Sequence, residues 1–480
     1  MMKHNLLNAF TLTTGCFFSL AAHAQSAIKE NQPNIIYILA DDLGYGDLSC
    51  YGQQLFETPN IDRLAAEGMR FTQHYAGSAL SAPSRCSLMT GKHTGHSRIR
   101  GNFAASNKRI NLTEDDVTIP ELLKKVGYST GMFGKWGLGE LGTVGTPNKK
   151  GFDEFFGYVN QKHAHFYYYP ILQHNGKQYE VKGNQENSRG QYNHDLIHSK
   201  AKEYITNQAK NGTPFFAYLA YTLPHSELDV PEDDLKKFLG KFDETPFLGS
   251  ESKGYKPQPT PFAAFCAMIT RLDRHVGEIM SLVKELGIDE NTLIVFTSDN
   301  GPHEEGGANP IFFNSNGGMR GIKRDLYDGG IREPMIVRWK NTILEGQTTD
   351  AVTAFWDVMP TLCDIAHVEA PKDIDGISFL PVLKGEELPA REYLYWELGE
   401  KSSFKQAVRM GDYKAVRYGL KNKIEIYDIV EDKSESTDLS NIRQDLVLKA
   451  MKIFAEAHME DPNFPMKDYV KKNKSNNKKK

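Results

Sequence analysis

Continuous apolar runs and segments of helical pattern alternate along the chain. Asn34–Ala40 (NIIYILA) contains no charged residue, which is typical of a strand buried on both faces. Residues 58–68 have a proline near the start and a glycine at the end, as helices commonly do. Further helices are predicted at 119–126 and 262–286, and further strands at 129–133, 215–221 and 292–297. This alternation predicts an α/β fold with a large, mostly parallel, mixed sheet flanked by helices.

The pattern changes from about residue 370. Short runs with a two-residue period occupy 393–396, 404–410, 413–417 and 424–429, and a helical pattern follows near 446–459. These segments predict a smaller C-terminal antiparallel sheet with a helix packed on it. We therefore expect a main domain over residues 25–369 and an α+β subdomain over residues 370–470.

The first 24 residues have the pattern of a secretory signal peptide. Lys3 and His4 precede an apolar run, and Ala22-His23-Ala24 supplies the small residues of a cleavage site. A membrane anchor is disfavoured, because threonines interrupt a run that is already shorter than the ~20 residues a span needs. We expect cleavage after Ala24, export to the periplasm or beyond, and no membrane span in the mature form.

Composition and charge add exclusions. The 480 residues are 40% hydrophobic and 25% charged, with 57 Lys and Arg against 61 Asp and Glu, as in an ordinary globular chain. Residues 471–480 hold six lysines and are predicted to be a disordered basic tail. Without these lysines and Lys3 the balance is 50 to 61, a net charge of −11, which does not favour nucleic acid as a partner. Five cysteines are too few for a disulfide scaffold, and the sequence gives no pairing for them.

Oxygen-bearing side chains follow two of the predicted strands. Asp41 and Asp42 come directly after the first strand, and Asp299 and Asn300 come shortly after the strand at 292–297. Ligand sites of open α/β sheets lie at the carboxyl ends of the strands, and adjacent carboxylates repel unless a cation neutralises them. Such a set suits Ca²⁺, with Mg²⁺ second. Each pair taken alone is better explained as a turn.

One segment decides between these interpretations. Residues 81–91 read Ser-Ala-Pro-Ser-Arg-Cys-Ser-Leu-Met-Thr-Gly and resemble the signature of the sulfatase family. Five further motifs occur in that family's order: Asp41-Asp42-Leu43-Gly44, Gly134-Lys135-Trp136, Pro224-His225, Ser298-Asp299-Asn300-Gly301, and Lys323 followed by Gly329-Gly330-Ile331-Arg332. The resemblance covers nearly the whole mature chain. It implies an alkaline-phosphatase-like fold and sulfate ester hydrolysis.

The resemblance also implies roles for individual residues. Ser81 would be oxidised to formylglycine by a radical-type maturing enzyme, as in bacterial sulfatases with a serine-type motif. The hydrated aldehyde carries one hydroxyl to attack sulfur and a second that later expels sulfate. Ca²⁺ would be bound by Asp41, Asp42, Ser81, Asp299 and Asn300. Arg85 would stabilise the diol and the sulfate, Lys135 and Lys323 would hold sulfate oxygens, and His225 would protonate the leaving alcohol.

One motif departs from the family. The family usually reads Lys-Trp-His-Leu-Gly, whereas this chain has Gly137 in place of the histidine. We hypothesise that His165 fills that space; the alternative is that His163 and His165 contact substrate or lie on the surface. The departure also creates a G-x-G-x-x-G pattern at 137–142, but Gly145 and Pro147 interrupt the helix that a dinucleotide site requires.

The substrate is narrowed only by resemblance. Gly137, the loop around His165 and the segment around Arg324 look like exported bacterial sulfatases that act on sulfated glycans, particularly on galactose or N-acetylgalactosamine sulfates, with 6-O-sulfate first. His165, His303, Arg324 and Asp325 are candidate substrate contacts. The aromatic residues 166–169 are a candidate wall for sugar stacking or, equally, part of the core. Two alternatives stay open: a phosphodiesterase or phosphonate hydrolase of the same superfamily, and a sulfated-glycan binding protein with weak turnover.

Overall fold

The computed structural model describes residues 32–400 and 403–467, so the predicted signal peptide (1–24) and basic tail (471–480) lie outside the described residues. Its main feature is an 11-stranded sheet in the order β10-β2-β9-β8-β1-β7-β3-β4-β5-β6, with β11 beside β2. The strands are β1 (Asn34–Ala40), β2 (Met69–Tyr75), β3 (Ser129–Lys135), β4 (Glu154–Tyr158), β5 (Ile171–His174), β6 (Lys177–Glu180), β7 (Phe215–Ala220), β8 (Thr292–Ser298), β9 (Arg332–Trp339), β10 (Gln347–Thr349) and β11 (Thr353–Ala354).

The centre of the sheet is parallel. Strand β1 pairs in parallel with β8 on one side and β7 on the other, and β7 continues in parallel to β3 and β4. Strands β9, β5 and β6 run antiparallel to their neighbours. The predicted mostly parallel, mixed sheet is therefore confirmed, and the carboxyl ends of β8, β1, β7 and β3 meet at one edge.

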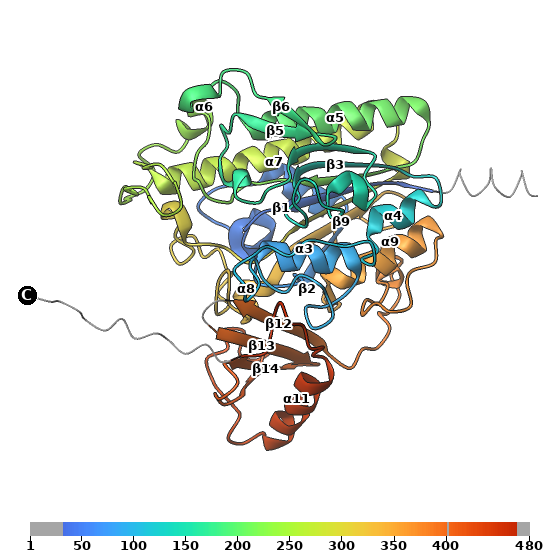
Figure 1. Ribbon diagram of the computed structural model, residues 1–480, viewed down its shortest axis with the longest axis vertical. Helices are drawn as coiled ribbons and strands as arrows, with labels where there is room; N and C mark the ends of the chain where they lie inside the picture. The colour runs from blue at the N-terminus through green and yellow to red at the C-terminus, as the bar shows by residue number, and fades with distance from the viewer. Residues whose placement is uncertain (1–31, 401–402, 468–480) are drawn as a thin grey trace, which may run out of the picture.

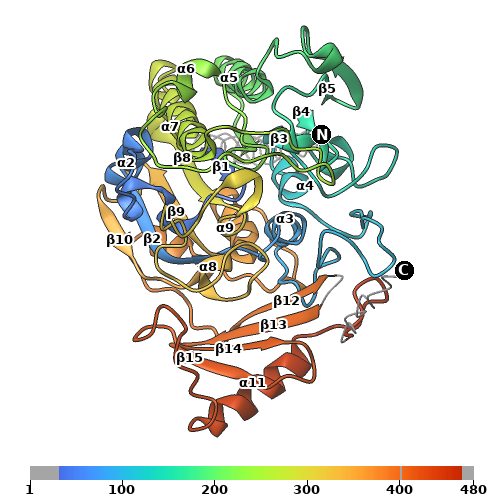
Figure 2. The same cartoon turned by 90° about the vertical axis from the view of Figure 1, so that its left-hand side faces the viewer.

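Helices cover both faces of this sheet (Figures 1 and 2). The alternation of β1 residues sets the two cores: Ile36 and Ile38 pack with side chains of α2, α5 and α7, and Tyr37 and Leu39 pack with side chains of α3, α4 and α9. The helices are α2 (Pro59–Ala66), α3 (Ser81–Thr90), α4 (Ile119–Lys124), α5 (Asn193–Asn211), α6 (Glu232–Leu235), α7 (Pro261–Glu285), α8 (Asp328–Ile331), α9 (Val358–Ala366), α10 (Leu380–Leu383) and α11 (Gln444–Glu456).

A second, four-stranded antiparallel sheet lies beside the first at the bottom of Figure 1. Its strands are β12 (Leu394–Glu400), β13 (Ser403–Met410), β14 (Tyr413–Tyr418) and β15 (Glu425–Asp428). One face, with Trp396 and Val416, packs against Tyr75 and Trp356 of the main body. The other face carries α11. This confirms the predicted small sheet with a helix packed on it.

Two further features concern the cysteines and the length of the apolar helices. Cys50, Cys86, Cys266 and Cys363 are free thiols in the described part of the chain. Among the described residues (32–400 and 403–467), no helix is both long enough and apolar enough to span a bilayer.

Candidate active site

The polar strand ends meet at the carboxyl edge of the parallel strands. Asp41 and Asp42 follow β1, Asp299 and Asn300 follow β8, and Lys135 is the last residue of β3. Because these strands are neighbours or next neighbours in the sheet, residues up to 258 positions apart come into contact. His225 lies in the loop after β7, and Lys323 lies in the loop before α8.

Ser81 begins α3 and lies among these groups with 1% of its surface exposed. Its Oγ donates to Asp41 Oδ1 at 3.1 Å, lies 3.4 Å from Asn300 Oδ1, and accepts a hydrogen bond from Lys135 Nζ at 3.2 Å. Pro83 sits in the first turn of α3, where its missing N–H costs no helical bond. The fold thus confines the side chain of residue 81 to one polar environment.

Arg85 follows Ser81 by one helical turn and is also buried. Its Nε donates to Asp299 Oδ2 at 2.8 Å, and its Nη1 donates to the Lys135 carbonyl at 2.8 Å. Its Nη2 lies 3.5 Å from Asp41 Oδ1. The Arg85 guanidinium is therefore held between two strand ends, and its side chain does not lie on the exposed face of the helix.

Two buried ammonium groups complete the centre. Lys135 Nζ lies 2.7 Å from Asp41 Oδ2, and Lys323 Nζ lies 2.6 Å from Asp42 Oδ2 and 3.2 Å from His225 Nε2. Three carboxylates (Asp41, Asp42, Asp299) therefore face three permanent or ammonium cations (Arg85, Lys135, Lys323). The set is balanced in charge when His225 is neutral.

The pKa shifts follow from this packing. Burial alone would raise the pKa of Asp41, but Lys135, His225 and Arg85 hold it well below its usual value. Burial and the neighbouring Asp41 carboxylate raise the pKa of Asp299, even though Arg85 contacts it. Burial, then Asp299 and Asp42, raises the pKa of the fully buried Glu333 well above its usual value. Burial is the largest influence on the pKa of all three carboxyl groups, and only at Asp41 do the neighbouring cations outweigh it.

The donor set fits a hard divalent cation. Ligand atoms of Asp41, Asp42 and His225 lie within 4.8 Å of one another, and Asp42 N donates to Asp299 Oδ1 at 3.1 Å. The Asn300 amide donates through Nδ2 to Asp42 Oδ1, which leaves its Oδ1 turned to Ser81. Buried carboxylate, amide and hydroxyl oxygens are the ligands that Ca²⁺ and Mg²⁺ prefer. A cation here would also relieve the repulsion that raises the pKa of Asp299.

Two of the histidines occupy inner positions. His225 is 3% exposed, its Nδ1 contacts the Ser226 carbonyl, and burial followed by Lys323 lowers its pKa well below the usual value. His303 is 1% exposed, with Nε2 bonded to the Pro224 carbonyl and Nδ1 accepting from the Glu305 N–H. Both ring nitrogens of His303 thus have partners within the protein, one of them in the loop that carries His225, and its contact with substrate stays a prediction.

Gln161 is the nearest neighbour of Gly137, and the hypothesis that His165 takes the place of the missing histidine stays a prediction. Gly137 has φ +78°, and the nearest neighbours of a side chain built there would be carbons of Gln161, at 3.8–3.9 Å. His165 lies with its ring 4.3 Å from that of His225, and its Nδ1 is 2.6 Å from the Tyr255 hydroxyl. The left-handed backbone explains glycine at 137. Residues 137–150 form turns and a short 3₁₀ helix in place of the longer helix that a dinucleotide site needs.

Arg324 lies at the outer rim. Its Nη2 donates to Glu305 Oε1 at 2.8 Å, and Lys253 Nζ reaches the same oxygen at 2.8 Å. Tyr255 donates to the other Glu305 oxygen, and these four residues line a cavity of about 370 Å³. Sequence reasoning did not identify Lys253, Tyr255, Glu305 or Gln161. They lie in irregular segments, where no periodic pattern or motif marks them.

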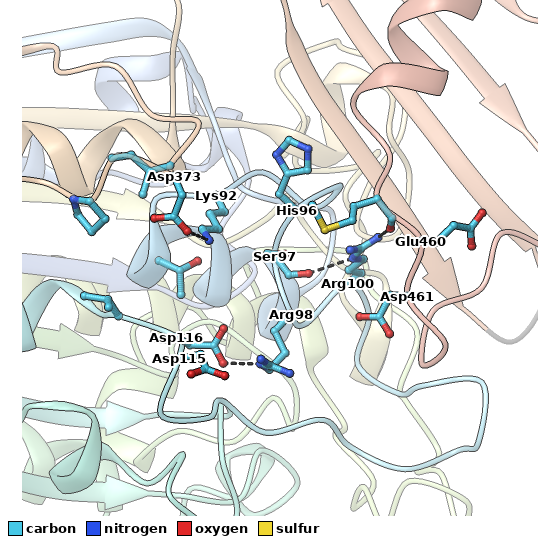
Figure 3. A pocket seen from close by; sticks show the side chains of 15 residues that line it. Lys92, His96, Ser97, Arg98, Arg100, Asp115, Asp116, Asp373, Glu460 and Asp461 are labelled. Carbon is cyan, nitrogen blue, oxygen red and sulfur yellow. Dashed lines mark hydrogen bonds and ion pairs between the residues drawn. The ribbon is translucent and has the colours of Figure 1, made fainter.

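A second charged cavity, about 310 Å³, lies at the other end of α3, roughly 15 Å along the helix from Ser81 (Figure 3). Its charges are largely paired: Lys92 with Asp373, and Arg98 with Asp116. Its acidic lining residues are Asp115, Asp116, Asp373, Glu460 and Asp461, and none of the strand-end groups or Ser81 lines it. We therefore assign the active site to the carboxyl edge of the sheet.

Comparison with known proteins identifies the family of the chain. The sulfatase family model matches residues 33–368, and the model described as N-sulphoglucosamine sulphohydrolase, C-terminal, matches residues 321–460. The chain is 31% identical over 494 residues to N-acetylgalactosamine-6-O-sulfatase of Bacteroides thetaiotaomicron, covering 92% of this chain and 96% of the relative. It is 31% identical over 426 residues to N-acetylgalactosamine-6-sulfatase of Canis lupus familiaris, covering 82% and 73%.

Among solved structures, the crystal structure of Ps i-CgsB in complex with k-i-k-neocarrahexaose superposes with a TM-score of 0.77 at 28% identity, covering 91% of this chain and 95% of that chain. A phosphonate monoester hydrolase of Agrobacterium radiobacter superposes with a TM-score of 0.65 at 20% identity, which shows a shared fold alone. The family model spans most of the described chain, including every strand end of the active site. The chain therefore belongs to the sulfatase family and is a sulfuric ester hydrolase.

Proposed function

We propose that this protein hydrolyses a sulfate ester on a sugar unit of a sulfated glycan, with 6-O-sulfated galactose or N-acetylgalactosamine as the preferred unit. The observation that carries the proposal is the position of Ser81 Oγ, held between Asp41, Asn300 and Lys135 in a buried, charge-balanced centre. Relatives named for N-acetylgalactosamine 6-sulfate, from mammals and from Bacteroides, support this sugar and this position.

Ser81 is the inferred precursor of formylglycine (3-oxoalanine), made by a radical-type maturing enzyme. The hydrated group supplies two hydroxyls on one carbon, so that sulfate can be both accepted and expelled. Arg85, which contacts Asp299 and lies near Asp41, supports this inference because a fixed guanidinium favours a negative oxygen on the residue one turn before it.

Asp41, Asp42, Asp299, Asn300 and the modified Ser81 are the inferred ligands of Ca²⁺, with Mg²⁺ as second choice. A bound cation supplies charge that draws the anionic sulfate and favours ionisation of the nucleophile. The centre without it is neutral, so a divalent ion brings a net charge of +2. That charge matches one sulfate monoester anion and one negative nucleophile oxygen.

The remaining residues divide the work on the substrate. Lys135 and Lys323 donate to sulfate oxygens, where each can exchange a carboxylate contact for a sulfate contact. When the S–O bond to the sugar breaks, the sugar oxygen keeps the bonding pair and takes a proton that His225 Nε2 relays. Lys323 Nζ, 3.2 Å from His225 Nε2, donates that proton to the ring, which ends neutral while the Lys323 ammonium becomes an amine. Arg324 at the rim is the proposed contact to the sugar, and His165, whose ring lies 4.3 Å from that of His225, is a second candidate.

We further propose export of the chain after cleavage of residues 1–24, a sulfatase domain over 25–369, an α+β subdomain over 370–470 and a basic tail over 471–480. Bacterial relatives that act on glycans support export. Accurate mass of the secreted protein tests the cleavage site, and limited proteolysis tests the division near residue 370.

The decisive experiment combines mass and activity. In the native host, the peptide that contains Ser81 should be lighter by two hydrogens than the unmodified peptide, and the protein should release sulfate from 6-O-sulfated N-acetylgalactosamine. A phosphodiester and a phosphonate monoester serve as control substrates. An unmodified serine with retained binding of sulfated sugar would support a binding protein instead, and faster hydrolysis of either control would support a phosphorus ester hydrolase.

A further inference from the structure

A cavity of about 430 Å³ lies next to the active site and shares a wall with it. We name it the aromatic cavity; its lining residues are Phe166, Tyr167, Tyr168, Tyr169, Pro170, Asn184, Glu186, Glu227, Asp229, Gly254 and Lys256. The shared wall is short. Phe166 directly follows His165, whose ring lies 4.3 Å from that of His225, and the Glu227 N–H donates to the His165 carbonyl at 2.9 Å.

Three partly exposed rings form one side of the aromatic cavity: Phe166, Tyr168 and Tyr169. Tyr169 stacks on His163, with ring centres 4.4 Å apart and planes 21° apart, and Phe166 lies nearly parallel to it at 6.3 Å. The Arg189 guanidinium holds Tyr168 from 4.4 Å above its ring. The rings are thus ordered before any ligand binds, which lowers the entropic cost of stacking against an apolar sugar face.

The rest of the lining includes polar and acidic residues. Glu227 and Asp229 are buried, and burial raises the pKa of each. Glu227 Oε2 accepts from the Lys256 N–H at 3.2 Å, and Arg189 pairs with Asp229. Including exposed Glu186, three carboxylates line the cavity against Lys256 in the lining and Arg189 beside it, which leaves one negative charge in excess. These carboxylates accept hydrogen bonds from hydroxyls and repel sulfate or carboxylate groups.

We propose that the aromatic cavity binds an uncharged sugar unit that is linked to the sulfated unit. The proposal rests on the proposed function of the active site and extends it to the neighbouring residue of the glycan. The volume is in the range of small-ligand sites. Stacking rings, hydroxyl acceptors and an excess of negative charge select an uncharged hexose or N-acetylhexosamine over a uronic acid or a sulfated sugar.

Three substrates test this selection. They are the 6-O-sulfated monosaccharide, the same unit linked to an uncharged hexose, and the same unit linked to a uronic acid. The wild-type protein should have the highest kcat/KM on the second, by about tenfold over the third, since one repelled charge costs about that much. Equal kcat/KM values on the two disaccharides would overturn the proposal.

Single-residue variants test whether the preference for the neutral disaccharide arises in the aromatic cavity. Tyr169→Ala should lower kcat/KM on the neutral disaccharide about fivefold to tenfold and leave the monosaccharide unchanged. Tyr393→Ala removes a partly exposed tyrosine that precedes the second sheet and is the matched control, expected to change neither. Glu227→Gln should raise kcat/KM on the uronic acid disaccharide. An equal loss on monosaccharide and disaccharide in Tyr169→Ala would refute the assignment.

A binding measurement separates the two levels of inference. Saturation-transfer NMR with the unsulfated neutral disaccharide should show contact with wild type and with the Ser81→Ala variant, and none with Tyr169→Ala. If this holds and none of the three substrates releases sulfate, the proposed catalytic function fails while the sugar site stands. If sulfate is released but the disaccharide gives no contact, the sugar site fails while the catalytic function stands.

Discussion

Replacing Lys135 by methionine separates electrostatic balance from catalysis at the strand ends. Lys135 Nζ lies 2.7 Å from Asp41 Oδ2 and 3.2 Å from Ser81 Oγ, and the residue is 1% exposed. Methionine keeps most of the side-chain volume and removes the charge. The variant centre then holds three carboxylates against Arg85 and Lys323 alone, a net charge of −1.

The structure gives the two effects opposite signs. Removing one cationic donor to a developing oxyanion costs about 3 to 4 kcal/mol, so kcat should fall by about 10²- to 10³-fold. Removing a positive neighbour should tighten Ca²⁺ binding, because two unit charges 4 Å apart repel by about 4 kcal/mol at an effective dielectric constant near 20. About one third of that energy is already a tenfold gain in affinity.

Calcium titrations monitored by thermal unfolding, together with kcat on a sulfated monosaccharide, measure both quantities. Lys150→Met is the matched control, since Lys150 is 2% exposed and pairs with Glu121 at 3.0 Å, away from the strand ends. It should lower stability without changing Ca²⁺ affinity or kcat. A Lys135→Met protein that binds Ca²⁺ more weakly, or that keeps kcat within about threefold, would refute the charge-balance reasoning.

Three other changes have defined outcomes. Ser81→Ala should abolish sulfate release, measured by ion chromatography, whereas Ser87→Ala on the same helix should keep it. His225→Asn should slow hydrolysis of a sugar sulfate at least tenfold more than that of 4-nitrophenyl sulfate, whose leaving group needs no proton. Burial lowers the pKa of His275 to about 4, so this neutral group stabilises the native state above pH 6.5 and loses about 3 kcal/mol of that contribution by pH 4. Urea unfolding should therefore show a flatter pH profile in His275→Phe, but not in the exposed control His367→Asn.

Whether an element can be predicted from the sequence depends on whether it buries apolar or polar side chains. Strand β1 was predicted at its observed bounds because all of its residues are buried and only its first, Asn34, is polar. Strand β9 was not predicted, since it starts Arg-Glu-Pro and buries Glu333 and Arg338. Helix α5 was missed because its buried face includes Asn193, His194 and other polar side chains. Polar burial removes the contrast on which pattern reading depends.

The active site was predictable as a set of residues but not as an arrangement. Asp41, Ser81 and Lys135 were identified by motifs, and their contact depends on the sheet order β8-β1-β7-β3, which no spacing reveals. The rim residue Glu305 and the Gly137 neighbour Gln161 lie in loops, so their roles emerge only from tertiary contacts. His303 illustrates the converse, because a histidine beside a metal motif proved to be held by backbone groups.

Net charge is a poor guide to the partner of this chain, and the local charges explain why. Outside its ends the chain is acidic, at −11, although a sulfated glycan is an anion. Exposed charges are screened beyond about 8 Å at physiological salt, so the acidic surface acts only nearby. The neutral centre would become attractive on binding a divalent cation, while the aromatic cavity beside it stays acidic. Together they would admit an anion at one point of the glycan and exclude it at the next, which makes the spacing of sulfate groups, and not their number, the basis of selection.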